Sequence, residues 1–290
     1  MPPNALLKNA LLLHTLKHQA KEFGITFDNL SYDWGAVIGR SRNVSDRLAG
    51  GVEFLFKKNK VDYVKGYGSV VDSTHVEVKA SDGSVQVLET SNIIIATGGK
   101  AREFPGLPFN GSNVIGSREA MTLPSQPSRM VIIGAGAIGV EFAYIYNAFG
   151  TEVTLVEMMP RLVPVEDDDI GDALKKSYSR QGIKCLTDTK VIATENAGDS
   201  VRVTVENAKG SQVIEADICL VAIGVVPVLP GGQLPEFTDR GWIQIGDRYE
   251  TSMRGVYAIG DIAGPPWLAH TAMYEATQCV DGIFLPEATP

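Results

Sequence analysis

Cysteine is scarce in this sequence, and the few cysteines present form no motif. Cys185, Cys219 and Cys279 are far apart, with neither a C-x-x-C pair nor a spacing typical of a metal site. We interpret them as small buried apolar residues, and we expect no metal site in the chain.

An excess of basic residues and long apolar runs are also lacking. The 26 Lys and Arg residues are outnumbered by 34 Asp and Glu residues, and the net charge is -8. This balance argues against a nucleic-acid partner, because binding to phosphates requires a basic surface. No segment approaches the roughly 20 apolar residues of a membrane span, and no signal peptide is evident. We therefore expect no membrane partner and a cytoplasmic location.

Glycine, in contrast, is abundant, and many of the 30 glycines lie in short clusters that follow apolar runs. Such clusters are typical of backbone turns placed against a ligand. At 290 residues the chain is long enough for one large or two ordinary domains.

The first part of the chain alternates between helical and strand-like patterns. Apolar residues recur with helical spacing over residues 4–23 and 44–58, and shorter alternating segments follow. The "SDG" at 81–83 predicts a hairpin turn between two of these segments. Residues 101–115 are rich in Pro and Gly and are expected to form a connector.

A different pattern begins after "PSQPSR". The apolar run 130–134 predicts a buried parallel strand, residues 137–149 a helix, and residues 152–157 the next strand. Strand, helix and strand in this order form the unit of a doubly wound sheet. The pattern continues with a helix at 168–181, strands at 189–195, 201–206, 212–216 and 216–224, the strand-like segments "GWIQIG" and "GVYAIGD", and a helix at 268–282.

Three glycines at the first turn of this unit, Gly134, Gly136 and Gly139, have the G-x-G-x-x-G spacing of a dinucleotide site. Gly134 permits the tight turn, Gly136 lets a pyrophosphate approach the backbone, and Gly139 lets helix and strand pack closely. The following helix offers its N-terminal N–H groups to the phosphates. The alternative is that these are only turn residues, but the strand before them and the helix after them favour the nucleotide site.

Glu157, at the end of the next strand, indicates which dinucleotide is bound. Its carboxylate can accept hydrogen bonds from both ribose hydroxyls, whereas a 2′-phosphate would meet a like charge. We therefore predict NAD rather than NADP. Arg161 follows closely and is able to pair with a 2′-phosphate, but Pro160 is expected to turn the chain first.

Two more turns with glycine follow apolar runs. One run, "IIIATGG", ends in Thr97, Gly98 and Gly99, and another, "VYAIGD", ends in Gly260 and Asp261. A carboxylate at the end of a strand can bind a polyol or a ribose hydroxyl. Its alternative role is a turn or helix cap, which the residues alone favour.

Taken together, the segments "GYGSV", "ATGG", "VIIGAGAIGVEFA", "TLVEMMPRLVPVED", "LVAIGVVP" and "VYAIGDIAGPPWLAH" resemble the flavin-dependent pyridine nucleotide-disulfide oxidoreductases. The resemblance runs over residues 2–283, and within the family it is greatest to the members that oxidise dihydrolipoamide. It implies an α/β fold with two Rossmann-like doubly wound nucleotide-binding domains, in which the NAD domain is inserted in the FAD domain. The implied domains are a first FAD-binding part at 1–113, a NAD-binding domain at 114–235 and a second FAD-binding part at 236–290.

The resemblance also implies which residues hold each cofactor. NAD is expected to contact Gly134, Ala135, Gly136, Ala137, Ile138, Gly139, Val140, Glu141, Glu157, Val191 and Gly224. FAD is expected to contact Gly68, Thr97, Gly98, Gly99, Asp261, Trp267, Leu268, Ala269 and His270. The last four of these would place a helix N-terminus against the flavin ring.

Glu141 is the one catalytic residue that the resemblance places in this chain, on the flavin side of the nucleotide helix. Its partner in the family is a lysine, and alignment of "MPPNALL" puts Asn4 at that position. An amide is able to hydrogen-bond Glu141 but not to neutralise it. The apolar face of residues 4–23 is expected to pack on the sheet of the FAD domain.

Three parts of the family's machinery are expected outside the chain: the first FAD-binding strand, the redox-active cysteine pair, and the C-terminal dimerisation domain with its His–Glu base. We therefore expect a chain truncated at both ends that does not turn over dihydrolipoamide. The intact protein would pass electrons from dihydrolipoamide through a disulfide and FAD to NAD. Its implied partners are the lipoyl domain of a 2-oxoacid dehydrogenase or glycine cleavage complex, and a second copy in a homodimer.

Other functions remain open at this point. The chain is alternatively part of another flavin disulfide reductase or NADH oxidase, or a stand-alone NAD-binding module. His14 and His18 have the i, i+4 spacing of a metal pair, but no third ligand accompanies them. The carboxylates of residues 165–172 precede a helix, so capping and interaction with the helix dipole explain them better than catalysis or calcium binding.

Overall fold

The computed structural model describes residues 2–285, and the chain divides into two compact units. Unit 1 comprises Met1–Leu55 and Ala101–Gly224, and unit 2 comprises Phe56–Lys100 and Val225–Pro290. Both units contain helices and strands, which confirms the α/β class. In the described part of the chain, no helix combines the length and the apolar character that crossing a bilayer requires.

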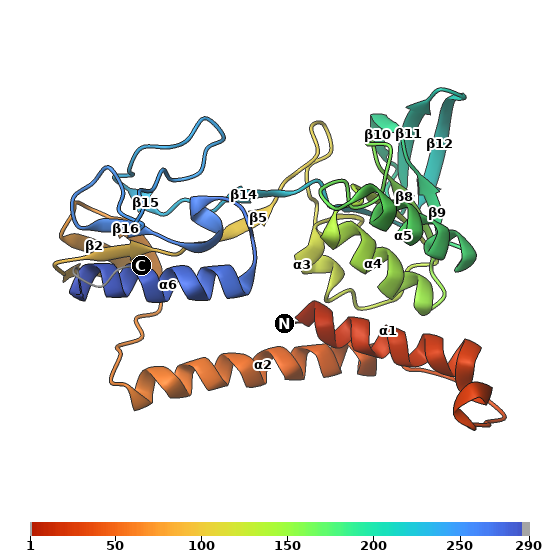
Figure 1. Ribbon diagram of the computed structural model, residues 1–290, viewed down its shortest axis with the longest axis horizontal. Coiled ribbons are helices and arrows are strands. Elements are labelled where there is room, and N and C mark those ends of the chain that lie inside the picture. The colour runs from red at the N-terminus through yellow and green to blue at the C-terminus, as the bar shows by residue number, and fades with distance from the viewer. Residues whose placement is uncertain (1, 286–290) are drawn as a thin grey trace. The chain divides into compact units, whose positions relative to one another are not determined.

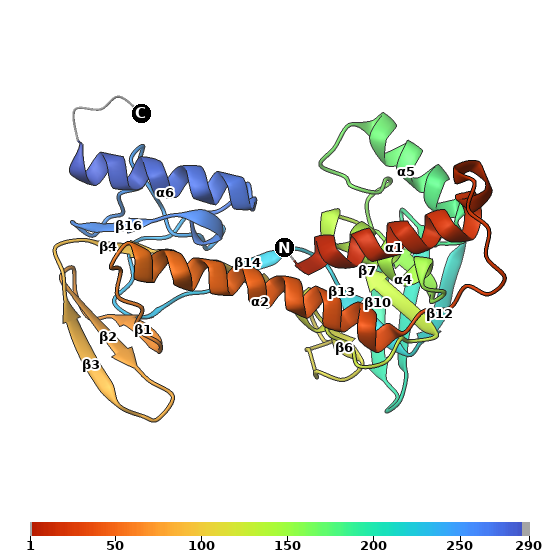
Figure 2. The same cartoon turned by 90° about the horizontal axis from the view of Figure 1, so that it is seen from below.

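Unit 1 is built on a parallel sheet of five strands in the order β6-β13-β7-β8-β9 (Figures 1 and 2). The expected strand–helix–strand unit consists of β7, a helix α4 and β8, and it is confirmed; a further helix, α5, leads from β8 to β9. Most positions of β7 and β8 are buried, which explains their continuous apolar runs. The bounds are β6 (Val114–Ile115), α3 (Ser117–Ala120), β7 (Arg129–Ile133), α4 (Ala137–Ala148), β8 (Glu152–Val156), α5 (Asp168–Arg180), β9 (Lys184–Leu186) and β13 (Ile218–Val221).

An antiparallel sheet supplies a second part of the core of unit 1. It consists of β10 (Lys190–Asn196), β11 (Val201–Asn207) and β12 (Gly210–Ala216), all three of which the sequence predicts. Alternate side chains of β11 are fully buried and pack in one cluster with Val131 and Ile133 of β7. The alternating pattern of this strand therefore reflects one face toward the core and one toward solvent.

The first helix, α1 (Pro2–Gln19), packs on α4 (Figure 2). Leu6, Ala10 and Leu13 are buried in one cluster with Phe142 and Tyr146 of α4. This face therefore packs on a helix of unit 1, and not on a sheet as expected. Helical spacing of apolar residues indicates that a face is buried, but it does not specify the surface that covers it.

The second helix is longer than the sequence predicts. After a short 3-10 helix, η1 (Ala20–Phe23), the helix α2 (Trp34–Lys58) begins at Trp34 rather than at residue 44. Asp33 precedes it and accepts a hydrogen bond from the N–H of Ala36 at 3.2 Å, as N-cap residues do. The Trp34 indole donates to the carbonyl of Leu123 at 2.9 Å and fixes this end of the helix to unit 1.

The two units do not follow the expected domain limits. Residues 1–55 belong to the same unit as the parallel sheet, although the resemblance places 1–113 in the FAD-binding part. Residues 225–235, expected in the NAD-binding domain, belong to unit 2. Residues 101–224 separate the two segments of unit 2, and residues 56–100 separate the two segments of unit 1. The assignment of the units to FAD and NAD stays a prediction.

Unit 2 combines a mixed sheet, in the order β15-β1-β2-β3, with a separate pair of parallel strands, β4 and β16. The hairpin predicted at "SDG" is confirmed, since β2 and β3 pair on either side of it. "GWIQIG" is not a strand; within it Ile243 forms only an isolated bridge with Phe237. Its apolar pattern reflects burial, since the Ile243 side chain lies fully within the core. The bounds are β1 (Tyr67–Val70), β2 (His75–Lys79), β3 (Val85–Glu89), β4 (Ile93–Ile95), β5 (Gly99–Ala101), β14 (Val225–Pro227), β15 (Gly231–Gly232), β16 (Val256–Ala258), η2 (Gly260–Ala263) and α6 (Ala269–Phe284).

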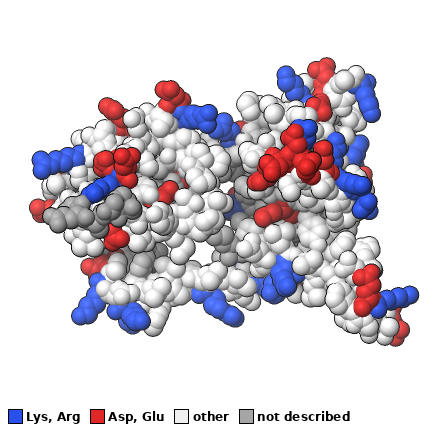
Figure 3. All heavy atoms as spheres, in the orientation of Figure 1, with Lys and Arg blue, Asp and Glu red and all other residues white. Residues whose placement is uncertain are grey.

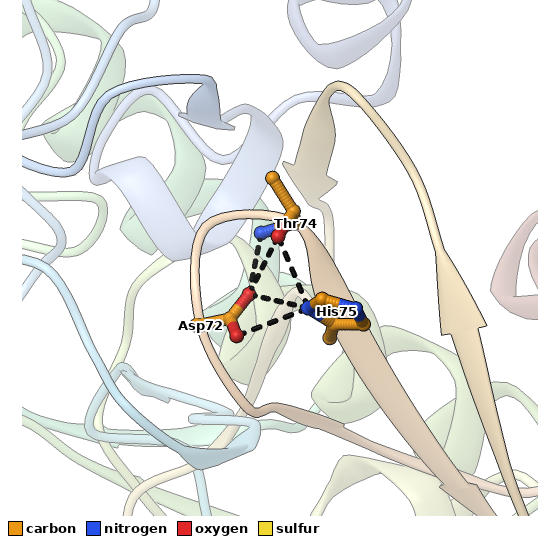
Figure 4. A network of polar contacts seen from close by, with 3 residues as sticks. All are labelled: Asp72, Thr74 and His75. Carbon is orange, nitrogen blue, oxygen red and sulfur yellow. Dashed lines mark hydrogen bonds and ion pairs between the residues drawn. The ribbon is translucent and has the colours of Figure 1, made fainter.

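Asp72 organises the turn between β1 and β2 (Figure 4). Its Oδ1 accepts hydrogen bonds from the backbone N–H and the hydroxyl of Thr74 at 2.7 and 2.9 Å. The Nδ1 of His75 lies 2.9 Å from the same oxygen. The backbone N–H of Thr74, followed by the ring of His75, lowers the pKa of Asp72 from 3.8 to about 2.

We expect the carboxyl of Asp72 to titrate near pH 2 when its signal is followed by NMR. Because its pKa is depressed in the folded state, its stabilising contribution is complete above about pH 4 and is lost as the pH falls toward 2. His75→Ala removes one of the contacts and should raise this pKa. A midpoint at the ordinary value in both proteins would contradict the hydrogen-bonded turn.

Candidate functional site

The glycine-rich turn between β7 and α4 places a different constraint on each of its three glycines. Gly134 has a φ of +99°, and a Cβ there would lie 2.5 Å from the carbonyl oxygen of Ala222. A Cβ on Gly139 would lie 1.9 Å from the carbonyl oxygen of Gly134. At Gly136, by contrast, no atom lies within 4 Å of the place of a Cβ. Gly136 therefore borders open space, as a glycine that faces a ligand should.

The turn leads directly into the N-terminus of α4. Gly136 is the N-cap residue, no side chain caps the helix there, and its first turn contains no acidic residue. The first N–H groups of a helix carry a partial positive charge and favour a negatively charged group. The geometry of this turn thus agrees with the space and the charge that a pyrophosphate requires.

Glu157 follows β8 and is 8% exposed. Its Oε2 accepts a hydrogen bond from the N–H of Ala135 at 2.7 Å, and its Oε1 accepts one from the N–H of Met159 at 2.9 Å. A carboxylate offers about four acceptor positions, so both oxygens keep capacity for ribose hydroxyls. The sequence predicts the position of this carboxylate beside the turn but not its bond to Ala135.

Arg161 is held by α5. Its Nη1 lies 2.9 Å from Oδ1 of Asp168, and its Nε lies 3.7 Å from Oδ1 of Asp172. Figure 3 shows acidic side chains gathered over this helix. The expected interaction with the helix dipole is confirmed, since Asp168 and Asp169 lie in the first turn. The expected side-chain capping is absent at the N-cap residue, Asp167, which makes no such hydrogen bond.

Glu141 lies on α4, one turn after the glycine-rich segment. It is half-buried, and burial raises the pKa of its carboxyl. No ion pair involves it among residues 2–285. Asn4 is exposed, and among the described residues no hydrogen bond joins it to Glu141. The reason is the orientation of α1, which turns Ala5 and Leu6 inward.

Two other residues expected at NAD lie elsewhere in unit 1. Val191 is on β10, half-buried against the cluster that contains the valines of β11. Gly224 follows β13 with a φ of +108°, and its carbonyl accepts a hydrogen bond from the N–H of Arg102 at 3.0 Å. The roles of Val191 and Gly224 toward NAD stay predictions.

In unit 2 the parallel pairing of β4 and β16 brings two of the predicted turns to the same edge. A Cβ on Gly99 would lie 3.7 Å from Oδ2 of Asp261, so the two segments are in contact. Gly98, next to them, has a φ of +74° and open space around the place of a Cβ. Gly68 belongs to β1, in the other sheet of the unit.

Helix α6 begins where the resemblance requires a helix N-terminus. Leu268 is its N-cap residue, without a side-chain cap, and Trp267 before it is 42% exposed. Glu275, in the middle of α6, accepts a hydrogen bond from the N–H of Gly260 at 2.6 Å and so fixes the helix beside Asp261. Sequence reasoning missed Glu275, because a contact between distant segments leaves no local pattern.

Two of the thiols and the histidine pair of α1 lie outside the turns described above. Burial raises the pKa of Cys185 to about 11 and that of Cys219 to about 12, so both thiols stay protonated at neutral pH. His14 and His18 lie with ring centroids 4.6 Å apart, and burial, followed by the neighbouring His18, lowers the pKa of His14. Throughout the described residues, no group of three or more His, Cys, Asp or Glu side chains is placed to hold a metal ion.

Comparison with known proteins identifies relatives of this chain. The model of a family described as pyridine nucleotide-disulphide oxidoreductase matches residues 3–276. A mitochondrial dihydrolipoyl dehydrogenase of Pisum sativum is 37% identical, over 97% of this chain and 57% of its own length. A dihydrolipoyl dehydrogenase of Chlorobaculum parvum is 41% identical, over 99% of this chain and 62% of its own.

Among solved structures, LpdA of Mycobacterium tuberculosis superimposes with a TM-score of 0.89 at 23% identity, covering 100% of this chain and 63% of that one. At this identity the match concerns the fold, and it agrees with the expected arrangement of Rossmann-like domains. The chain spans less than two thirds of the length of each of these three proteins.

Proposed function

Because the chain belongs to the pyridine nucleotide-disulphide oxidoreductase family, we propose that the whole protein oxidises dihydrolipoamide to lipoamide and that this chain contributes its nucleotide sites. Electrons would pass through a disulfide and FAD to NAD+. The proposal rests on the relatives named dihydrolipoyl dehydrogenase, which are similar over nearly the whole chain. The lipoyl domain of a larger complex as substrate carrier, a homodimer and a cytoplasmic location are part of this proposal.

We place the NAD site in unit 1, and the main support for this proposal is the environment of the three glycines. Gly136 leaves space for the pyrophosphate, and the N-terminus of α4 favours its negative charge. The carboxylate of Glu157 lies beside this turn, bonded to the N–H of Ala135. NAD+, when bound, supplies the acceptor for a hydride. The chain's own contribution is to orient the dinucleotide through these groups.

Unit 2 is the proposed FAD site. Asp261 and Gly99 lie together at the end of β4 and β16, where a carboxylate can hold a polyol hydroxyl. The N-terminus of α6, positioned by Glu275, offers a partial positive charge to a ring that becomes negative on reduction. FAD supplies the two-electron carrier between the disulfide and NAD+.

Two measurements test the proposal. A fluorescence titration of this chain should show that NADH binds at least tenfold more tightly than NADPH, and equal affinities would refute the preference for NAD that we assign to Glu157. Protein isolated from its native source should reduce NAD+ with dihydrolipoamide. Oxidation of NADH by oxygen, without any reduction of NAD+ by dihydrolipoamide, would refute the proposed substrate and favour an NADH oxidase.

A stand-alone NAD-binding module is the second candidate. It is favoured because the parallel sheet and two core clusters all lie within unit 1. In addition, Cys185 and Cys219 stay protonated and so offer no thiolate for redox chemistry. NADH binding by a native protein that carries no flavin would support this candidate over the first.

The ion pairs of Arg161 with α5 yield a prediction about cofactor choice. In the double variant Asp168→Asn and Asp172→Asn, the guanidinium is released and becomes available to a 2′-phosphate near Glu157. We expect the affinity for NADPH to rise about fivefold, within the range of exposed charge pairs, with little change for NADH. Asp169→Asn, on the same helix turn but outside these ion pairs, is the control and should leave both affinities unchanged.

A further inference from the structure

A cavity of about 580 Å³ lies at the outer edge of the parallel sheet of unit 1, beside β9. Its walls are the end of β9, residues 187–189, the turn between β11 and β12, and Lys175 of α5. Its volume is within the range of small-molecule sites. Neither the glycine-rich turn nor Glu157 contributes to its walls. The cavity nevertheless borders the proposed NAD site, because the N–H of Thr189 donates to the carbonyl of Glu157 at 3.0 Å.

Hydrogen bonds fix the polar wall of this cavity in place. The hydroxyl of Thr189, a residue that is 1% exposed, donates to the carbonyl of Thr187 at 2.8 Å. The same hydroxyl accepts a hydrogen bond from the side-chain amide of Asn207 at 3.3 Å, which joins the β11–β12 turn to this segment. The wall is therefore formed in advance of any ligand.

Positive charge exceeds negative charge on the cavity wall. Lys175 is half-buried and donates to the hydroxyl of Thr187 at 2.7 Å, while Lys209 lines the cavity from the β11–β12 turn. The wall contains one carboxylate, Asp188. In the part of the chain that the structure describes, neither lysine has a carboxylate partner. A half-buried ammonium group loses hydration, and an anionic ligand would compensate this loss.

We propose that this cavity binds a small organic anion through its phosphate or carboxylate oxygens, with Lys175 and Lys209 as the charged contacts. The hydroxyl of Thr187 is placed to donate to the same oxygens. A bare inorganic ion would leave most of the volume unfilled, so the ligand carries an organic part as well.

Calorimetric titration at constant ionic strength tests the site with citrate, glucose 6-phosphate and inorganic phosphate as probes. We expect saturable binding of at least one organic anion, more tightly than inorganic phosphate. Citrate alone would identify a carboxylate site, and glucose 6-phosphate alone a phosphate site. Lys175→Gln and Lys209→Gln should each lower the affinity for the bound probe about tenfold, the usual effect of losing one charged hydrogen bond.

Lys176→Gln is the matched control, because Lys176 is the next residue of α5 and is exposed outside the cavity. It should leave the affinity unchanged, and equal weakening would show that only the general charge of the surface matters. Lys209 is exposed, so its variant remains informative if Lys175→Gln fails to fold. Saturating NADH should not displace the probe. If NADH displaces the probe, or if no probe binds saturably, the proposal of an anion site distinct from the NAD site is wrong.

Discussion

The variant Gly139→Ala should unfold at a clearly lower urea concentration than the unmodified chain and should no longer bind NADH. The added Cβ would lie 1.9 Å from the carbonyl oxygen of Gly134, which is backbone and has no freedom to rotate away. Helix α4 would have to move from the turn, and overpacking of this kind costs about 3 kcal/mol. Urea unfolding and NADH fluorescence titration measure the two losses.

Gly136→Ala provides the contrast within the same turn. Its φ is -71°, and the place of its Cβ is open, so the free energy of unfolding should fall by less than about 1 kcal/mol, as for other substitutions at an N-cap. NADH binding should still weaken at least tenfold, because the methyl group takes the space of the pyrophosphate. If Gly139→Ala is as stable as Gly136→Ala, the close packing of α4 on the turn is contradicted.

Glu157→Gln should have the second largest effect, on both stability and cofactor choice. Glutamine has one acceptor oxygen, whereas the N–H groups of Ala135 and Met159 each donate to a separate oxygen of Glu157. One of these two donors would then face an NH2 group, at a cost of about 1–3 kcal/mol in the free energy of unfolding if it is the buried N–H of Ala135. Loss of the carboxylate also removes its repulsion of a 2′-phosphate, so the preference for NADH over NADPH should fall about tenfold.

Glu152→Gln is the control for this variant. Glu152 is the first residue of β8, the strand that Glu157 follows, and it is exposed. We expect its unfolding curve and its two cofactor affinities to match those of the unmodified chain. An unchanged ratio of NADH to NADPH affinity in Glu157→Gln would show that another group selects the cofactor.

The nucleotide turn is predictable from the sequence because its requirements are local. A strand, three spaced glycines and a helix indicate a tight turn, and Gly134 and Gly139 lack room for a Cβ as expected, whereas Gly136 borders open space. The hydrogen bond from Ala135 to Glu157 was not predicted, because it depends on the packing of two neighbouring strands.

Contacts between distant segments account for most of what the sequence does not reveal. The apolar stripe of α1 predicts burial, but its partner, α4, is distant in the chain. The early start of α2 was missed because Gly35 and Gly39 weaken the helical pattern there. The hydrogen bond from Gly260 to Glu275 similarly follows from the packing of α6, and no motif signals it.

The packing of α1 on α4 also has a consequence for folding during synthesis. Lys17 of α1 donates to the carbonyl of Ala148, a partner that is 131 residues further along the chain. Ribosomes add about 5–20 residues per second, so α1 leaves the ribosome roughly 7–26 s before the helix that covers it. During this interval its leucines are exposed, and a chaperone that binds apolar helices has time to hold the nascent chain until α4 is complete.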